Sequence, residues 1–181
     1  MIFTVMTVNF ASANGDYAAI TSNAKIADSL RALESINAGD VLSILNGRNL
    51  TQKPIRVLFR ELEMFGMGNC EAVTMKTQGG GLIIYINKKH ENAPSEAIAC
   101  LIAHESQHHL QTNTQAEELR AWLKETSTWN AFVRRDPNLA YSNHALVKRQ
   151  NYIDRMYVKD NGGADNIKKL IVNNPQYAGL N

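Results

Sequence analysis

The stretch Ser95-Glu-Ala-Ile-Ala-Cys-Leu-Ile-Ala-His104-Glu-Ser-Gln-His108-His-Leu110 decides how the rest of the chain is interpreted. It follows Asn92-Ala-Pro-Ser95, in which proline suits the first turn of a helix and Asn or Ser can cap it. We therefore predict one helix that ends near Leu110. His104 and His108 stand four residues apart, about one helical turn, so both imidazoles face one side and can share a cation.

Glu105 stands between these histidines in the pattern His-Glu-x-x-His. It lies about 100° from His104 and about 60° from His108 around the helix, so it can reach a water on the cation without binding the cation itself. The same face carries apolar residues, and a metal would satisfy polar groups buried among them. The pattern indicates one Zn²⁺ per chain with Glu105 as general base. The rival interpretation is a fortuitous match on an ordinary helix.

A third metal ligand has to come from outside this helix, because catalytic zinc usually has three protein ligands and a water. Thr114-Gln-Ala-Glu117 matches a capping box, which assigns the Glu117 side chain to the start of its own helix. Glu118 has Ala121 three residues further on, where a small side chain lets two helices approach. We predict Glu118 as the third ligand, with Glu117, Glu125 or a histidine as alternatives.

His104-Glu105-x-x-His108, followed on the next helix by Glu118-x-x-Ala121, resembles the zincin metallopeptidases, and among them the gluzincin-like groups with a Glu third ligand. The resemblance runs from Ser95 to Trp129 and implies an α+β, zincin-like fold. A small sheet of about three strands would precede the active-site helix, the ligand helix and C-terminal helices. The implied activity is hydrolysis of peptide bonds. Trp122 stands where several such groups carry Asp, so the subfamily stays unassigned.

The resemblance also implies where substrate binds. The strand before the active-site helix binds extended peptide in that family, which would make Leu82, Ile83, Ile84, Tyr85 and Ile86 the substrate strand. A Tyr or His from the C-terminal part often stabilises the oxyanion, and the candidates here are His144, Tyr141 and Tyr152.

Two alternatives to a peptidase remain open. The chain could be a zincin-fold binding module without turnover, or it could hold a structural zinc with Cys100 or His109 as the fourth ligand. Glu105 would have no role in either, so the pattern favours an enzyme.

The flanking sequence predicts the other elements. Residues 54–60 alternate apolar and polar side chains, which indicates a strand, and two further strands at 72–75 and 82–86 flank Gly79-Gly-Gly81, a hairpin turn or glycine-rich loop. Apolar residues spaced by three and four predict a helix before Asn37, which we expect to cover the sheet as a lid. Further helices are predicted at about 114–133, 142–158 and 164–172.

Composition sets the remaining bounds. The 181 residues are 44% hydrophobic and 20% charged with a net charge of +2, which fits a single globular domain over residues 14–181. No dense basic stripe is present, so we expect no nucleic-acid partner. No run of eighteen apolar residues is present either, so we expect no membrane span. The expected partner is a peptide or protein substrate, and the oligomeric state is left open.

Residues 1–13 and the two cysteines bear on the cellular compartment. The segment ends in Ala11-Ser12-Ala13, a small-x-small pattern, but lacks a basic start, so it is either the remnant of an export signal or an N-terminal strand. Export to the periplasm or the medium is favoured over the cytoplasm. Cys70 and Cys100 could form a disulfide in an exported protein or remain two small thiols.

Overall fold

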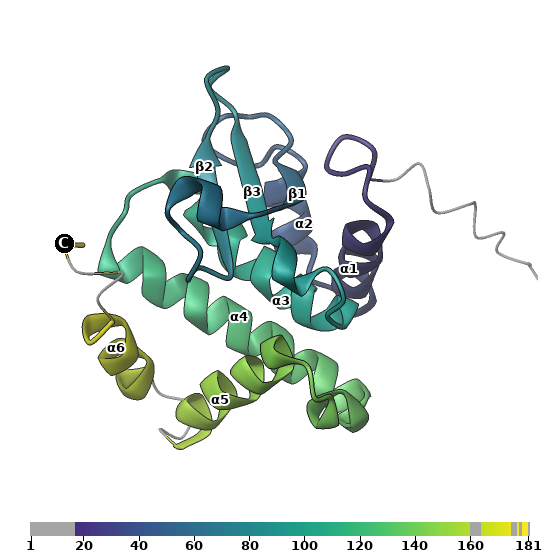
Figure 1. Cartoon of the computed structure of the whole chain (residues 1–181), viewed down its shortest axis with the longest axis vertical. Helices are drawn as coiled ribbons and strands as arrows, with labels where there is room; N and C mark the ends of the chain where they lie inside the picture. The colour runs from purple at the N-terminus through teal and green to yellow at the C-terminus, as the bar shows by residue number, and fades with distance from the viewer. Residues whose placement is uncertain (1–16, 160–163, 175–176, 178, 181) are drawn as a thin grey trace, which may run out of the picture.

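The computed structural model describes residues 17–159, 164–174, 177 and 179–180, and it shows an α+β fold (Figure 1). The segment 1–13 lies outside these residues. The described chain forms six α-helices and three strands, in the order α1 (Ala24–Ser35), α2 (Gly39–Leu45), β1 (Arg56–Arg60), β2 (Ala72–Lys76), β3 (Leu82–Asn87), α3 (Ser95–Ser106), α4 (Gln115–Arg135), α5 (Ala145–Lys159) and α6 (Asp165–Val172). Short 3-10 helices are η1 (Leu62–Phe65), η2 (Lys88–His90), η3 (Gln107–Leu110) and η4 (Pro137–Tyr141).

The sheet is mixed, with the strand order β1-β3-β2. β1 runs parallel to β3, and β2 runs antiparallel to it. The assignment of Leu82–Ile86 as the substrate strand stays a prediction, but β3 is hydrogen-bonded to a neighbouring strand along both edges and has no free edge to which a peptide can add. The edge strand that contacts α3 is β2. Strand order within a sheet depends on how the chain crosses over, which the alternation of residues along each strand does not reveal.

The two faces of β3 have different partners. Ile84 and Ile86 belong to the main core, which fills the space between the sheet, α1 and α3. Tyr85 lies on the opposite face, where its ring stacks on Phe65 with centroids 5.6 Å apart. Residues 97–106 of α3 are buried on every side, so α3 is the central element of the fold.

Helix α1 packs chiefly against α3 and does not cover the sheet as a lid. Figure 1 shows it beside α3, at the end of the described chain nearest residue 17. Its start is capped by Asn23, whose side chain accepts from the amide of Ile26 at 3.1 Å. Its end is marked by Asn37 at a φ of 59°, and α2 follows directly from Gly39, a helix that the sequence analysis did not predict.

The C-terminal half is built on α4. This helix begins after Thr114, ends before Asp136 and packs along α3. α5 and α6 pack against α4 on the side away from the sheet (Figure 1). A second, smaller core lies there around Trp122, Ile153, Ile167 and Ile171. Among the described helices, none combines the length and apolar character that crossing a membrane requires.

Neither Cys70 nor Cys100 forms a disulfide in the described chain, and Cys100 is fully buried within α3. The sequence left open whether the two cysteines form a disulfide or remain thiols. The structure agrees with the second alternative.

We expect the two faces of the sheet to differ in their contribution to stability. Ile84→Ala removes a fully buried side chain from the main core and should lower the free energy of unfolding by about 2–5 kcal/mol. Leu58→Ala acts on the half-buried opposite face and should cost about 1 kcal/mol. Urea denaturation measures both, and equal losses would contradict the assignment of the faces.

Candidate metal centre

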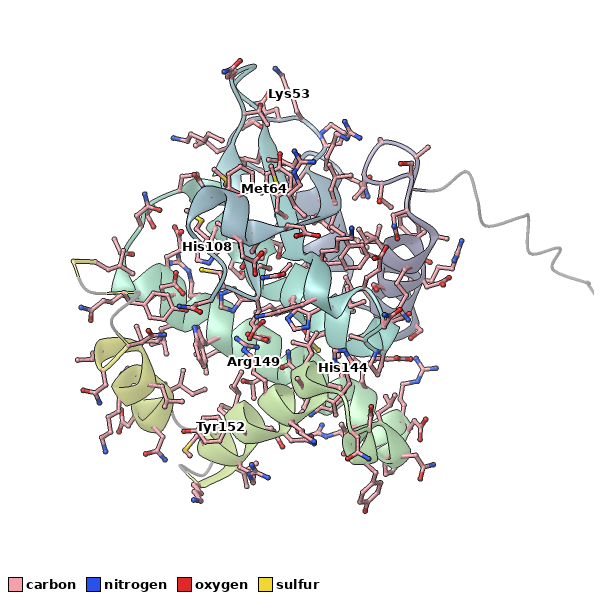
Figure 2. All side chains as sticks on the ribbon, viewed as in Figure 1. Lys53, Met64, His108, His144, Arg149 and Tyr152 are labelled. Carbon is pink, nitrogen blue, oxygen red and sulfur yellow. The ribbon has the colours of Figure 1, made fainter. Side chains whose placement is uncertain are left out.

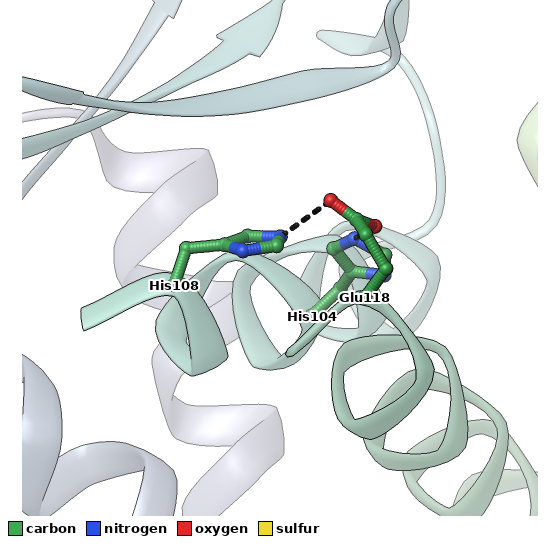
Figure 3. A group of neighbouring side chains, drawn as sticks. All are labelled: His104, His108 and Glu118. Carbon is green, nitrogen blue, oxygen red and sulfur yellow. Dashed lines mark ion pairs between the residues drawn. The ribbon is translucent and has the colours of Figure 1, made fainter. Parts of the chain in front are cut away.

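His104 and His108 lie at the junction of two helix types. The α-helix ends at Ser106, and His108 stands on the 3-10 turn η3, so the predicted α-helix to Leu110 is one turn too long. The two imidazole centroids are nevertheless 5.4 Å apart. Figure 3 shows the ring of His108 turned toward a carboxylate oxygen of Glu118, with the ring of His104 close to Glu118 as well. The spacing of the two histidines thus brings their rings together although the helix tightens between them.

Glu118 on α4 completes the group. Its carboxylate oxygens lie 3.8 Å from His104 Nε2 and 3.6 Å from His108 Nε2. One donor atom from each of the three residues lies within 4.8 Å of the other two. Tetrahedral zinc with bonds of about 2.0–2.1 Å would place its ligand atoms about 3.3 Å apart, so the three side chains would draw closer together around the ion. Glu118 Oε2 is also buried without a hydrogen-bond partner in the described chain, which is costly unless a cation pairs with it.

This set is the one group of His, Cys, Asp or Glu side chains in the described residues whose donor atoms converge closely enough for a metal. Two imidazole nitrogens and one carboxylate suit a divalent cation such as Zn²⁺. Neither Cys100 nor His109 belongs to the group. The three residues brought together here are the ones that the sequence analysis proposed as metal ligands.

The other two glutamates of α4 hold the histidines from behind. Glu125 lies 3.0 Å from His104 Nδ1, and Glu117 lies 2.8 Å from His108 Nδ1. An ionised carboxylate only accepts hydrogen bonds, so each Nδ1 donates its proton, and in the neutral form of the ring this leaves the lone pair of Nε2 available for a metal. This pairing is the arrangement that metal-binding histidines usually have.

The electrostatics keep both of these carboxylates ionised. Burial alone would raise the pKa of Glu125, but the charge of Arg149 and the hydrogen bond from His104 lower it to about 2. Burial also opposes ionisation of Glu117, and hydrogen bonds from Thr112 and His108 nevertheless lower its pKa.

The capping box predicted at the start of α4 is only half formed. The Thr114 hydroxyl accepts from the amide of Glu117 at 3.2 Å, as expected. The Glu117 carboxylate, however, accepts from the amide of Thr112 at 2.8 Å and from its hydroxyl, and it does not return to Thr114. Glu117 is therefore occupied, but its partners are Thr112 and His108. The sequence pattern could not distinguish a helix cap from a carboxylate that holds a metal-binding histidine.

Arg149 is a site residue that the sequence analysis missed. Its guanidinium forms an ion pair with Glu125, with Nη2 3.3 Å from Oε2, and it lies 5.4 Å from the centre of the Trp122 ring. Gln150 donates to the other Glu125 oxygen at 2.6 Å. These contacts neutralise a carboxylate that has no exposure to solvent. Arg149 stands on a helix remote in sequence from the histidines, and no motif marks it.

A pocket of about 380 Å³ opens in front of the three candidate ligands. We call it the metal pocket. Its walls come from the segment before β2 and β2 itself, from α3 and η3, from α4, from α5 and from the C-terminal segment. They are lined by Asn69, Cys70, Glu71, Ala72, Val73, Thr74, Leu101, His104, Glu105, His108, Gln111, Asn113, Glu118, Trp122, Arg149, Asn174 and Tyr177.

The three predicted oxyanion residues do not line the metal pocket. Tyr141 is 81% exposed, and Tyr152 is also exposed. His144 accepts from the amide of Leu146 through Nδ1 at 3.1 Å, and its ring lies edge-on to His90. Figure 2 shows His144 and Tyr152 well separated from His108. All three come from η4, α5 or the turn between them, and the one residue of this region that lines the pocket is Arg149.

Tyr177 lines the metal pocket instead. Its hydroxyl accepts from Trp122 Nε1 at 3.2 Å, and burial together with the charge of Glu118 raises its pKa, so the phenol stays protonated. It follows α6, whose packing on α4 brings the end of the chain to the site. The apolar spacing that predicted α6 was the one available signal that this end of the chain is ordered.

Glu105 lines the same pocket and is 6% exposed, but it is not one of the converging ligands. Its Oε2 accepts from the hydroxyl of Thr74 on β2 at 2.8 Å. The structure thus places the carboxylate that we predicted as a base beside the candidate ligands, turned toward the edge strand. Thr74 was not predicted, because nothing in β2 marks a residue that reaches across to α3.

We expect substitutions of the neighbouring Glu117 and Glu118 to have different effects, because one glutamate would bind the metal and the other holds a histidine that binds it. Glu118→Gln removes a charged ligand and should abolish stoichiometric zinc binding at micromolar concentration. Glu117→Gln leaves the three ligands in place and should retain one zinc per chain with about 10- to 100-fold weaker affinity, because His108 loses its anionic partner. Zinc content after dialysis, with affinity from chelator competition, decides between these outcomes, and similar results for both variants would contradict the assignment.

We also expect protons to compete with zinc at this group. Burial alone would lower the pKa of His104, but Glu125 and the other carboxylates raise it, and burial raises the pKa of Glu118. Groups with raised pKa values keep their protons to higher pH, so zinc has to displace those protons as pH falls. Affinity should be full at about pH 8 and fall by about tenfold per pH unit for each displaced proton toward about pH 5.5. Chelator competition across this range measures the slope, and a flat profile would contradict it.

The chain was compared with protein-family models, with curated proteins and with solved structures, and none of these matched it.

Proposed function

We propose that the protein is a zinc-dependent peptidase of zincin-like architecture. The observation that carries the proposal is the arrangement around α3. Two histidines, each held at Nδ1 by an ionised glutamate, turn Nε2 toward the buried oxygens of Glu118, and Glu105 stands beside them without joining the group. A metal site with an adjacent free carboxylate suits hydrolysis by activated water.

The chemistry follows from the roles of these residues. Zinc held by His104, His108 and Glu118 would supply the positive charge that acidifies water and polarises a carbonyl group. Glu105 accepts the proton of the attacking water as its oxygen forms a bond to the scissile carbonyl carbon. The same carboxylate then gives that proton to the leaving amine as the carbon–nitrogen bond breaks. No proton is left over, and Glu105 returns to its starting state.

The edge strand β2 supports a peptide as substrate. Its residues Ala72, Val73 and Thr74 line the metal pocket, and β3 pairs with one side of β2 only. An extended peptide can therefore add to its free side through main-chain hydrogen bonds. These observations support β2 as the substrate strand of the proposed peptidase.

Two residues of the pocket can stabilise the developing oxyanion. Tyr177 offers a protonated hydroxyl, and Arg149 has guanidinium N–H groups beyond those that bind Glu125. Both belong to the C-terminal part of the chain, but only Tyr177 is of the Tyr or His type that the resemblance to zincins implied, and neither is one of the residues chosen from the sequence.

The alternative of a four-ligand structural zinc receives less support. No fourth His, Cys, Asp or Glu in the described residues joins the group, and the candidate ligands line an open pocket. A binding module without turnover would keep the same metal group, and it differs from a peptidase only in the outcome of an activity assay.

We expect Glu105→Gln to separate the base from the ligands. The variant should keep one zinc per chain and lose peptide hydrolysis by at least about 100-fold, because Gln cannot accept the proton. Zinc content and cleavage of a quenched peptide library by zinc-loaded protein measure the two properties. The matched control is Glu96→Gln, a carboxylate in the first turn of the same helix, which should leave both unchanged. Full activity in Glu105→Gln would overturn the mechanism, and zinc-loaded wild-type protein without activity would favour the binding module.

A further inference from the structure

Thr74 is in contact with Glu105 at two points. Its hydroxyl lies 2.8 Å from the carboxylate oxygen Oε2 and 2.9 Å from the main-chain carbonyl oxygen of the same residue. A hydroxyl has one proton to donate, so the two acceptors share it. The contact joins the edge strand of the sheet to the last turn of α3, over thirty-one residues of sequence.

The contact also settles which oxygen of Glu105 is available. No other hydrogen bond to this carboxylate occurs in the described chain, so Oε2 is held and Oε1 is the oxygen free to meet a water molecule. Glu105 is almost fully buried and one residue from a candidate ligand, where a rotation of its side chain would bring it toward the metal. Thr74 therefore determines the orientation of the base.

The main-chain N–H and C=O groups of Thr74 lie along the free edge of β2, in a different direction from its side chain. The amide of Asn87 donates to the carbonyl of Glu71 at one end of the hairpin, and the amide of Thr77 donates to the carbonyl of Gly81 at the other. In an antiparallel pair, hydrogen-bonded and non-hydrogen-bonded pairs alternate. The N–H and C=O groups of Ala72 and Thr74 consequently point away from β3, toward the side where β2 has no neighbouring strand among the described residues.

We infer that Thr74 is a positioning residue through which an extended peptide on β2 is aligned with the base Glu105. The inference rests on the proposed peptidase function. Its main chain holds the substrate while its side chain holds the carboxylate, so the two reacting partners are placed by one residue. Substrates that pair with β2 on both sides of the scissile bond fix Thr74 more firmly than short peptides do, and they gain in kcat as well as in binding.

The test compares Thr74→Val, which keeps the shape and removes the hydroxyl, with Thr74→Ser, which restores it. The substrates are an eight-residue quenched peptide that wild-type protein cleaves and its four-residue core around the scissile bond. We expect Thr74→Val to keep one zinc per chain and a KM within about twofold, and to lose about 10- to 100-fold in kcat on the longer peptide. Its kcat should become equal for the two peptides, and Thr74→Ser should recover most of the difference.

Thr128→Val is the matched control, because Thr128 is a buried threonine of α4 that lies outside the metal pocket. It should leave the kinetics unchanged. Wild-type kinetics in Thr74→Val, or a Thr74→Ser variant as slow as Thr74→Val, would overturn the inference and leave the peptidase intact. Zinc-loaded wild-type protein that cleaves neither the library nor these peptides would overturn the proposed function itself, and the inference with it.

Discussion

A single buried carboxylate connects the parts of this fold that matter for its site. Glu125 is completely inaccessible to solvent and binds His104 on α3 together with Arg149 and Gln150 on α5. An uncompensated charge at this position would be strongly destabilising, so the three helices have to meet in one relative placement for the charge to be neutralised. The same placement points His104 Nε2 into the pocket. Stability of the helical layer and orientation of the first ligand therefore depend on one set of contacts.

His108, the second candidate ligand, is supported by a separate set of contacts. Glu117 reaches His108 from the first turn of α4, and Thr112 in the preceding connection holds the carboxylate in place. The short connection between η3 and α4 contains Gln111 and Asn113 at positive φ, so its path is tightly constrained. Glu118, the neighbour of Glu117, lies about 100° further around the helix and faces the pocket. Adjacent residues on one helix can thus act on opposite sides of the same histidine.

Much of this arrangement could be predicted from the sequence, because it depends on local spacing. The separation of His104 from His108 and the boundaries of α4 follow from helical periodicity and capping, and both agree with the structure. The order of the strands, the origin of Arg149 and Tyr177 in the C-terminal helical region, and the reach of Thr74 across to Glu105 all depend on contacts between distant segments. No single-sequence pattern encodes such contacts. For the same reason, the exposed Tyr141 and Tyr152 and the half-buried His144 could not be distinguished from residues that face the pocket.

The spacing of the site along the chain has a consequence for the order in which it assembles. All three candidate ligands lie between residues 104 and 118, so closing the loop that joins them costs little chain entropy. The contact between Glu105 and Thr74 spans a longer loop and requires the β2–β3 hairpin to dock on α3. We expect a partly folded chain to capture its metal through local helical contacts before the sheet is in place. The ability to hold a metal and the ability to orient the base would then arise at different stages of folding, and damage to the sheet could leave the first without the second.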